Sequence, residues 1–234
     1  MKRHIPNTIT LVNLFCGCGA LVAVLHSQFI LVAWFLLVAA LADYLDGAVA
    51  RLFGVNSPLG KELDSLADMV SFGVVPGAIL YALLVEGWGI SLESGVVWKA
   101  MPAFFLSVLS GLRLGKFNLD NRQEEHFLGL PTPASTVFVV GLMLVYEFDS
   151  YQWREFILNV GFLYTCVVVL SLLLISEIPM FHFKFKALTW KGNEIKLAFI
   201  VISIIALLLL REAAISLLIL LYVLINLAKL AIRR

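Results

Sequence analysis

The sequence Asp43-Tyr-Leu-Asp46-Gly47-Ala-Val-Ala50-Arg51 ends a long apolar run, and Gly60-Lys-Glu-Leu-Asp64-Ser-Leu-Ala-Asp68 follows it after eight residues. Asp43 lies about 15 residues into that run, which is about 22 Å along a helix. The carboxylates are therefore expected near one end of a membrane-spanning helix. Ionisable side chains in such helices are energetically costly and by default mark a functional site.

The rest of the chain has the composition of a membrane protein. Of its 234 residues, 61% are hydrophobic and 14% are charged, and the mean hydropathy is +0.97. Soluble domains carry about 25% charged residues, so this chain has too little polar surface to cover a globule. The net charge of +1 gives no reason to expect a nucleic-acid partner.

Apolar blocks of about 20 residues predict membrane-spanning helices. No long soluble segment and no repeat interrupts them, so we expect one membrane domain, residues 1–234. The predicted fold is all-α, a polytopic bundle of about eight transmembrane helices. The blocks cover residues 9–25, 28–51, 58–84, 97–117, 131–148, 156–175, 195–210 and 213–232.

The distribution of Lys and Arg predicts the orientation of this bundle, because basic residues concentrate in cytoplasmic segments. With a cytoplasmic N-terminus, fourteen of the seventeen basic residues fall in inner segments. Only Lys99, Arg154 and Arg211 fall outside. We therefore expect a multi-pass protein of the cell (cytoplasmic) membrane whose acidic stretch faces the cytoplasm. An even helix count depends on a break at Arg211 and Glu212.

Helical spacing brings the acidic residues together. Asp43 and Asp46 share one helix face with Gly47 and Ala50, and Asp64 and Asp68 share one face of the next helix. A short turn joins the two helices, so we expect them to run antiparallel, side by side, with four carboxylates converging on one cavity. A pair of aspartates near a helix end is often only an interfacial polar feature, but four at this spacing favour a site.

Clustered carboxylates repel one another unless protons or cations offset their charge. Oxygen-only ligands favour Mg²⁺ or Mn²⁺, and such ions commonly bind through a few carboxylates together with substrate phosphates. Gly47, Ala50 and Gly60 leave room for a bulky ligand near the backbone. The sequence therefore predicts a metal site, with one ion or a pair, that accepts a diphosphate substrate.

The stretch resembles the signature of the CDP-alcohol phosphotransferase family, D-x2-D-G-x2-A-R-x8-G-x3-D-x3-D. All eight fixed positions match: Asp43, Asp46, Gly47, Ala50, Arg51, Gly60, Asp64 and Asp68. Further segments are similar to the phosphatidylserine synthase branch of that family, and eight helices also suit that branch. These segments are Ile5-Pro-Asn-Thr-Ile-Thr-Leu-Val-Asn13, Glu62-Leu-Asp-Ser-Leu-Ala-Asp-Met-Val-Ser-Phe-Gly73, Arg113-Leu-Gly-Lys-Phe-Asn118 and Gly129-Leu-Pro-Thr-Pro-Ala134.

The resemblance covers about the first 140 residues, and the remainder matches only in hydropathy. It places the catalytic signature at 43–68, acceptor-side segments at 113–134 and C-terminal helices at 156–232. One departure is Gly115-Lys116, where a pair nearer Ala-Arg is expected. The resemblance also implies a homodimer.

The activity that the resemblance implies is transfer of a phosphatidyl group from CDP-diacylglycerol to L-serine. Asp43, Asp46 and Asp64 would hold two metal ions, with a leaning toward Mn²⁺. Asp68 would complete the metal site and act as general base. The same chemistry with glycerol 3-phosphate or an inositol phosphate, or with an archaeal ether-lipid donor, stays open.

Two substrate subsites follow from the same resemblance. The CDP-lipid site would involve Gly47, Ala50, Arg51 and Gly60, with Asn7 and Thr10 near the cytidine; a helix-cap role for Thr10 is the alternative. A buried serine carboxylate needs a cationic partner. The candidates are Arg113 first, then Lys116 and Arg122, with Asn118 as a possible ligand of the amino group. Topology alone could also explain these basic residues, and a helix cap could explain Asn118.

Two other classes fit the sequence less well. Intramembrane aspartyl proteases carry Tyr-Asp and Gly-x-Gly-Asp sequences, whereas Asp43-Tyr44 has the first in reverse order and the second does not occur. Ion transporters place charges at the bilayer midplane on broken helices, often in repeated halves. This chain clusters its charges near one face and has no repeat.

Overall fold

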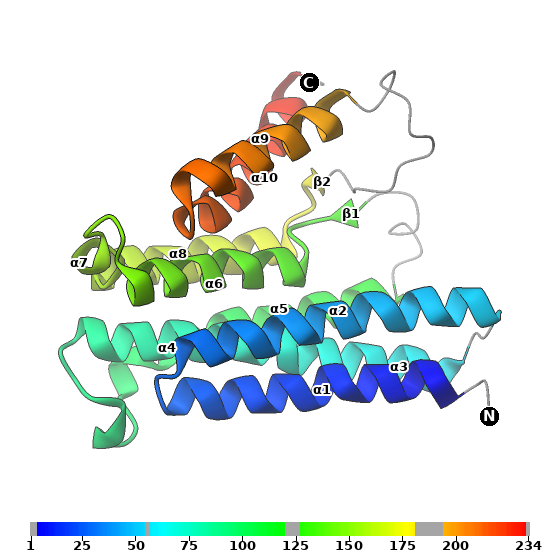
Figure 1. The fold of residues 1–234 in the computed structure, drawn as a ribbon, viewed down its shortest axis with the longest axis horizontal. Helices are drawn as coiled ribbons and strands as arrows, with labels where there is room; N and C mark the ends of the chain where they lie inside the picture. The colour runs from blue at the N-terminus through cyan, green and yellow to red at the C-terminus, as the bar shows by residue number, and fades with distance from the viewer. Residues whose placement is uncertain (1–3, 55–56, 120–126, 181–193, 233–234) are drawn as a thin grey trace.

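The computed structural model describes residues 4–54, 57–119, 127–180 and 194–232. Within these residues the protein is an all-α polytopic membrane bundle (Figure 1). The helical elements, in chain order, are α1 (His4–Leu25), α2 (Phe29–Phe53), α3 (Pro58–Asp68), η1 (Met69–Val74), α4 (Val75–Gly87), η2 (Leu92–Ser94), η3 (Trp98–Phe104), α5 (Phe105–Leu119), α6 (Thr132–Phe148), α7 (Arg154–Ile157), α8 (Val160–Ile175), α9 (Glu194–Leu210) and α10 (Ala213–Ile232).

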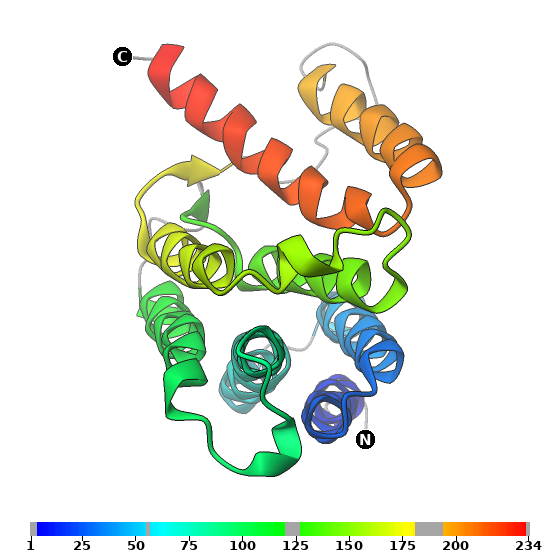
Figure 2. The ribbon, with the colours of Figure 1, turned by 90° about the vertical axis from the view of Figure 1, so that its left-hand side faces the viewer.

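Each of the eight predicted segments contains a helix. Four continuous helical stretches are long and apolar enough to cross a membrane by length and composition: 4–25, 29–53, 58–87 and 213–231. Three shorter apolar helices accompany them, at 132–148, 160–175 and 199–210. The predicted break before the last helix is confirmed, because Arg211 and Glu212 form a turn between α9 and α10, seen as a hairpin in Figure 2.

Helix α4 is the centre of the bundle. It packs against α1, α6 and α8, and Ile79, Leu80, Leu83 and Leu84 are completely buried along it. An apolar side chain gains little from leaving lipid, so close packing rather than water exclusion holds such an interior together. The tight interior fixes the elements around α4, including those that carry the acidic residues.

One predicted helix differs from a regular α-helix. The segment predicted at 58–84 contains a π-helical turn, η1, between α3 and α4. Such turns leave carbonyl groups without regular helical partners, which is costly away from water. Two hydroxyls from neighbouring helices supply donors: Thr136 donates to the Phe72 carbonyl (2.9 Å) and Ser107 to the Gly73 carbonyl (2.8 Å). The π turn therefore ties the end of the acidic helix to α5 and α6.

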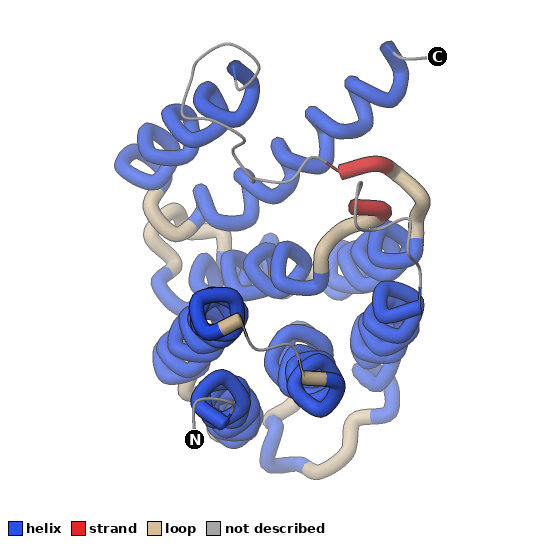
Figure 3. The backbone as a smooth tube through the Cα atoms, turned by 90° about the vertical axis from the view of Figure 1, so that its right-hand side faces the viewer, coloured by secondary structure: helices blue, strands red, loops and turns tan. Residues whose placement is uncertain are grey.

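The arrangement of α1, α2 and α3 corrects one expectation. Helices α2 and α3 were expected side by side, but their backbones make few contacts, and α1 packs against both of them. Figure 3 shows the three helices from the end that carries the acidic residues. The carboxylates of α2 and α3 therefore meet without close packing of the two backbones.

A short strand pair lies toward the same end. β1 (Phe127–Leu128) pairs antiparallel with β2 (Pro179–Met180), with Phe127 opposite Met180. Leu130, which follows β1, also donates from its backbone N–H to the Leu173 carbonyl (2.9 Å) at the end of α8. These bonds place the beginning of α6 beside the end of α8.

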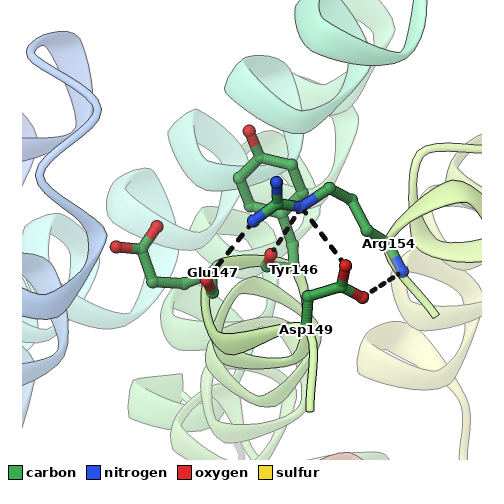
Figure 4. Close-up of polar contacts among 4 residues, drawn as sticks. All are labelled: Tyr146, Glu147, Asp149 and Arg154. Atoms are coloured by element: carbon green, nitrogen blue, oxygen red, sulfur yellow. Dashed lines mark hydrogen bonds and ion pairs between the residues drawn. The ribbon is translucent and has the colours of Figure 1, made fainter. Parts of the chain in front are cut away.

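At the other end of the bundle, Arg154 closes the C-terminus of α6 (Figure 4). Its Nε donates to the Tyr146 carbonyl (3.1 Å) and its Nη2 to the Glu147 carbonyl (3.4 Å). Asp149, in the left-handed conformation with φ of 46°, accepts from the Arg154 backbone N–H (2.9 Å) and lies 4.0 Å from the Arg154 Nε. The last carbonyls of a helix lack partners within it, so Arg154 acts as a cap.

Candidate active site

Three of the four predicted carboxylates meet at one point. Carboxylate oxygens of Asp43, Asp64 and Asp68 all lie within 4.8 Å of one another. Asp43 comes from α2, and the other two lie one turn apart on α3. All three side chains are half-buried. The expected convergence of two helix faces is therefore confirmed for these residues, across the space that separates α2 from α3.

Asp46 lies beside this group on α2 and is buried, with 6% of its surface exposed. Its Oδ2 accepts a hydrogen bond of 2.5 Å from the Thr10 hydroxyl. Thr10 sits inside α1 rather than at its end, so it does not cap that helix. The contact instead joins the N-terminal segment to the acidic cluster.

The acidic group lies close together without balancing cations. The only ion pair within 4.0 Å between two described residues is Arg154–Asp149, at the other end of the bundle. Several carboxylates in a poorly solvated space repel one another strongly. The donor set, all oxygen, suits a hard divalent cation.

Two residues that the sequence analysis quoted but gave no role support Asp68. The Asn13 amide donates to Oδ1 of Asp68 (3.2 Å), and its own Oδ1 accepts from the Ser71 hydroxyl (2.7 Å). Asn13 is completely buried, as is Ser71. Thr10, Asn13 and Gly17 follow the i, i+3, i+7 spacing of one helix face. That spacing is the signal from which Asn13 could have been found.

The predicted CDP-lipid residues lie in the N-terminal parts of α1 and α3 and in the C-terminal part of α2. Asn7 lies against Gly60, because a Cβ added at Gly60 would come 3.1 Å from the Asn7 Oδ1. The Arg51 guanidinium folds back along α2, where it would lie 3.4 Å from a Cβ at Gly47. Ala50 is half-buried on the turn between them. The structure thus brings Asn7 together with Gly60, and Arg51 together with Gly47.

A cavity of about 450 Å³ borders the carboxylates, and none of these CDP-lipid residues lines it. Asp64 and Asp68 line it, as do Arg113 and Asn118 from α5. Arg113 is buried, with 6% of its surface exposed, and its Nε and Nη2 have no hydrogen-bond partner. A buried guanidinium with two nitrogens that lack hydrogen-bond partners is costly, so this cavity offers an anion a strong and specific partner.

The remaining predicted acceptor residues are placed differently. Asn118 lines the cavity, but its side-chain amide already donates to the Ser65 hydroxyl (2.8 Å). Its backbone carbonyl accepts a hydrogen bond from the Lys61 ammonium (3.2 Å). Lys116 is exposed and does not line the cavity. Arg122 lies outside the described residues. Pro131 and Pro133 begin α6 beside the cavity, as expected for a helix entry.

Comparison with known proteins agrees with this geometry. A family model described as CDP-alcohol phosphatidyltransferase matches residues 3–172. The chain is 36% identical over 184 residues to a protein of Mycobacterium leprae named CDP-diacylglycerol--serine O-phosphatidyltransferase. Proteins of the same name from Helicobacter pylori (strain J99) and Bacillus subtilis are 31% and 32% identical over 205 and 182 residues.

These matches cover most of this chain and differing shares of the relatives. They span 75%, 86% and 78% of the chain, respectively. The chain spans 57% of the length of the Mycobacterium leprae relative, and 80% and 92% of the other two. The matched family segment contains all four aspartates, Arg113 and Asn118. The chain therefore belongs to the CDP-alcohol phosphatidyltransferase family.

Proposed function

We propose that this protein transfers the phosphatidyl group of CDP-diacylglycerol to L-serine, forming phosphatidylserine and CMP. The observation that carries the proposal is the meeting of three carboxylates beside a cavity lined by a buried guanidinium, two of whose nitrogens lack hydrogen-bond partners. The carboxylates suit the diphosphate chemistry of the family. The guanidinium suits an acceptor with a carboxylate, and the relatives named above are serine enzymes.

The acidic cluster fits a divalent cation. Asp43, Asp64 and Asp68 would hold it, with Asp46 next to them, and a pair of Mn²⁺ or Mg²⁺ ions is the expected occupancy. When bound, such ions polarise the phosphoryl oxygens and offset the charge that develops on the departing nucleotide. The side chains supply only oxygen ligands, and thiols or imidazoles do not contribute to the described cluster.

The reaction needs a base for the acceptor hydroxyl, and Asp68 is placed for that role. It belongs both to the carboxylate cluster and to the lining of the cavity. The serine oxygen attacks the phosphorus that carries diacylglycerol, the bond from that phosphorus to the CMP oxygen breaks, and the serine proton passes to Asp68. A carboxylate within hydrogen-bond reach of the hydroxyl contributes typically 10²- to 10⁴-fold to such a step.

Two different sets of residues next to the carboxylates would give the two substrates separate places. The CDP-lipid would bind along Asn7, Thr10, Gly47, Ala50, Arg51 and Gly60, where small residues leave space next to the backbone. L-serine would enter the cavity and present its carboxylate to Arg113. In this arrangement the hydroxyl and the diphosphate approach Asp68 and Asp64 from these separate places.

The membrane setting follows the same proposal. The acidic end would face the cytoplasm, where CDP-lipid head groups and serine are accessible, and the lipid tails would remain in the bilayer beside the helices. The excess of basic residues in segments at that end supports this orientation. The homodimer stays a prediction from the family resemblance.

The test is product identity. Purified protein in detergent would receive CDP-diacylglycerol, Mn²⁺ or Mg²⁺, and one acceptor at a time: L-serine, glycerol 3-phosphate or inositol phosphate. Mass spectrometry of the lipid fraction is expected to detect phosphatidylserine with L-serine and no new lipid with the other acceptors. A phospholipid formed from another acceptor would contradict the serine assignment and leave the metal-site proposal in place. An ether-lipid analogue of the donor, supplied in parallel, measures donor preference.

A further inference from the structure

The cavity beside Arg113 has one wall that lies outside the matched family segment. Phe199 of α9, and Ile219 and Tyr222 of α10, line it opposite the residues of α3, α5 and α6. The family model ends at residue 172. The part of the chain common to the family therefore supplies the carboxylates and Arg113, while the C-terminal helices supply a wall that the family model does not include.

Close packing on α6 fixes the position of α10. A Cβ at Gly141 would come 2.6 Å from the Ser216 backbone nitrogen and would also collide with the Ser216 hydroxyl. That hydroxyl donates to the Phe138 carbonyl (2.8 Å). Helix α10 packs on α6, and Figure 2 shows it crossing above that helix. The contact sets α10 at one depth and one rotation relative to α6.

The packing of Ser216 on α6 places Tyr222, farther along α10, at the acceptor cavity. Tyr222 lies six residues beyond Ser216, which is about 9 Å along the helix. Its side chain is buried, with 6% of its surface exposed, and it lines the cavity with Pro131 and Thr132 from the start of α6. Arg113 lines the same cavity. The aromatic ring thus borders the space in which an anion bound to Arg113 would sit.

We propose that Tyr222 determines which acceptors the cavity admits, by limiting its length beyond Arg113. This inference rests on the proposed serine transfer and names a residue that sets its specificity. An acceptor held by its carboxylate at Arg113 and by its hydroxyl at Asp68 must fit between the two. Tyr222 lines the same cavity as both, so the bulk of its ring limits the volume left for a longer carbon chain. A smaller side chain at 222 opens that volume.

The experiment compares Tyr222→Ala, Tyr222→Leu and Tyr222→Phe with a matched control, Val223→Ala. Val223 is the next residue on α10 and is buried, but it lines a neighbouring apolar cleft with α6 and α8 rather than the acceptor cavity. CMP release would be measured with L-serine and with L-homoserine, which has one more methylene. The apparent KM for CDP-diacylglycerol would be measured in parallel.

Tyr222→Ala is expected to raise the KM for L-serine about tenfold and to raise the homoserine-to-serine ratio of kcat/KM about tenfold, since one methylene in a fitted pocket changes selectivity by that order. The KM for CDP-diacylglycerol stays within about twofold, as expected for a residue that touches only the acceptor. Tyr222→Phe keeps the ring and the selectivity. Val223→Ala keeps the wild-type KM for L-serine and the wild-type homoserine-to-serine ratio of kcat/KM.

An unchanged homoserine-to-serine ratio in Tyr222→Ala, or an equal rise in both KM values, would overturn the inference. If Tyr222→Ala does not fold, Tyr222→Leu provides the same comparison with a larger apolar side chain. The wild-type protein separates the two proposals. Serine transfer by the wild type with an unchanged ratio in the variants refutes the role of Tyr222 alone, and no serine transfer by the wild type refutes both.

Discussion

Asn13 of α1 and Asp68 of α3 are joined by a hydrogen bond of 3.2 Å from the Asn13 amide to Oδ1 of Asp68. The Ser71 hydroxyl, 2.7 Å from the Asn13 Oδ1, fixes the orientation of that amide. A carboxylate can only accept, so the amide nitrogen must point toward Asp68. The proposed base is therefore held by a chain of two side chains, both completely buried.

Asn13→Ala is expected to lower kcat about 10- to 100-fold, the range typical for a residue that orients a metal ligand. The KM for L-serine should change little, because Asn13 does not line the acceptor cavity. Ser71→Ala should have the same effect to a smaller extent. CMP release at saturating substrates measures both.

The control for this prediction is Thr8→Ala. Thr8 lies on the same helix, is exposed, and donates its hydroxyl only to the His4 carbonyl within that helix (2.9 Å). Its kcat should match the wild type. An Asn13→Ala protein with wild-type kcat would show that Asp68 does not depend on this contact.

Arg113 provides the second prediction. Arg113→Ala is expected to raise the KM for L-serine more than tenfold and to leave the KM for CDP-diacylglycerol nearly unchanged, because loss of a buried charge partner costs several kcal/mol. Arg113→Lys keeps the charge but loses the paired donors of the guanidinium, and should be intermediate.

Lys116→Ala is the matched control, since Lys116 is a nearby, exposed cation outside the cavity. It should behave like the wild type. Equal increases of both KM values in Arg113→Ala would instead indicate that Arg113 supports the fold and does not bind the acceptor.

Gly17 allows α1 to approach η1. A Cβ at this position would collide with the Ser71 hydroxyl and come 3.1 Å from the Ser71 backbone nitrogen. Gly17→Ala is therefore expected to lower the unfolding temperature in detergent, with a cost of about 1–3 kcal/mol for overpacking. It should also lower kcat, since Ser71 supports Asn13.

Gly115→Ala tests whether the loss of stability in Gly17→Ala comes from the close approach of α1 to η1. Gly115 lies in α5 and has no atom within 4 Å of an added Cβ. In an open helical position the change should stabilise the helix by about 0.5–1 kcal/mol. A Gly17→Ala protein as stable as Gly115→Ala would contradict the packing at α1 and η1.

The cap at the other end of the bundle gives a prediction without an effect on catalysis. Arg154→Ala removes the two side-chain hydrogen bonds to the end of α6. The expected loss of stability is about 1 kcal/mol, because the side chain is half-exposed and solvent screens it. The unfolding temperature should fall while kcat stays unchanged. Glu155→Ala, at the neighbouring exposed position, should change neither, and a fall in kcat with Arg154→Ala would show that the two ends are coupled.

The features that could be predicted from the sequence are those with a local cause. Long apolar blocks gave the helices, and i, i+3 and i+4 spacing put Asp64 and Asp68 on one face. The π turn η1 could not be predicted, because Thr136 and Ser107 stabilise its carbonyl groups from distant helices. The position of Tyr222 at the cavity could not be predicted for the same reason, since it depends on the close packing of Ser216 against Gly141. Nothing in the hydropathy of α10 distinguishes that face from a lipid-facing one.

The most direct test of the central claim is metal-dependent release of CMP from CDP-diacylglycerol with L-serine, compared among the wild type, Asp64→Asn, Asp68→Asn and Glu93→Gln. Glu93 is an exposed acidic residue of η2, away from the cluster. We expect release by the wild type and Glu93→Gln only with Mn²⁺ or Mg²⁺. Asp64→Asn should lose metal affinity and activity, and Asp68→Asn should still bind CDP-lipid while its release of CMP falls by at least about 100-fold. Retained turnover in Asp68→Asn, or release that does not need a metal ion, would contradict the account.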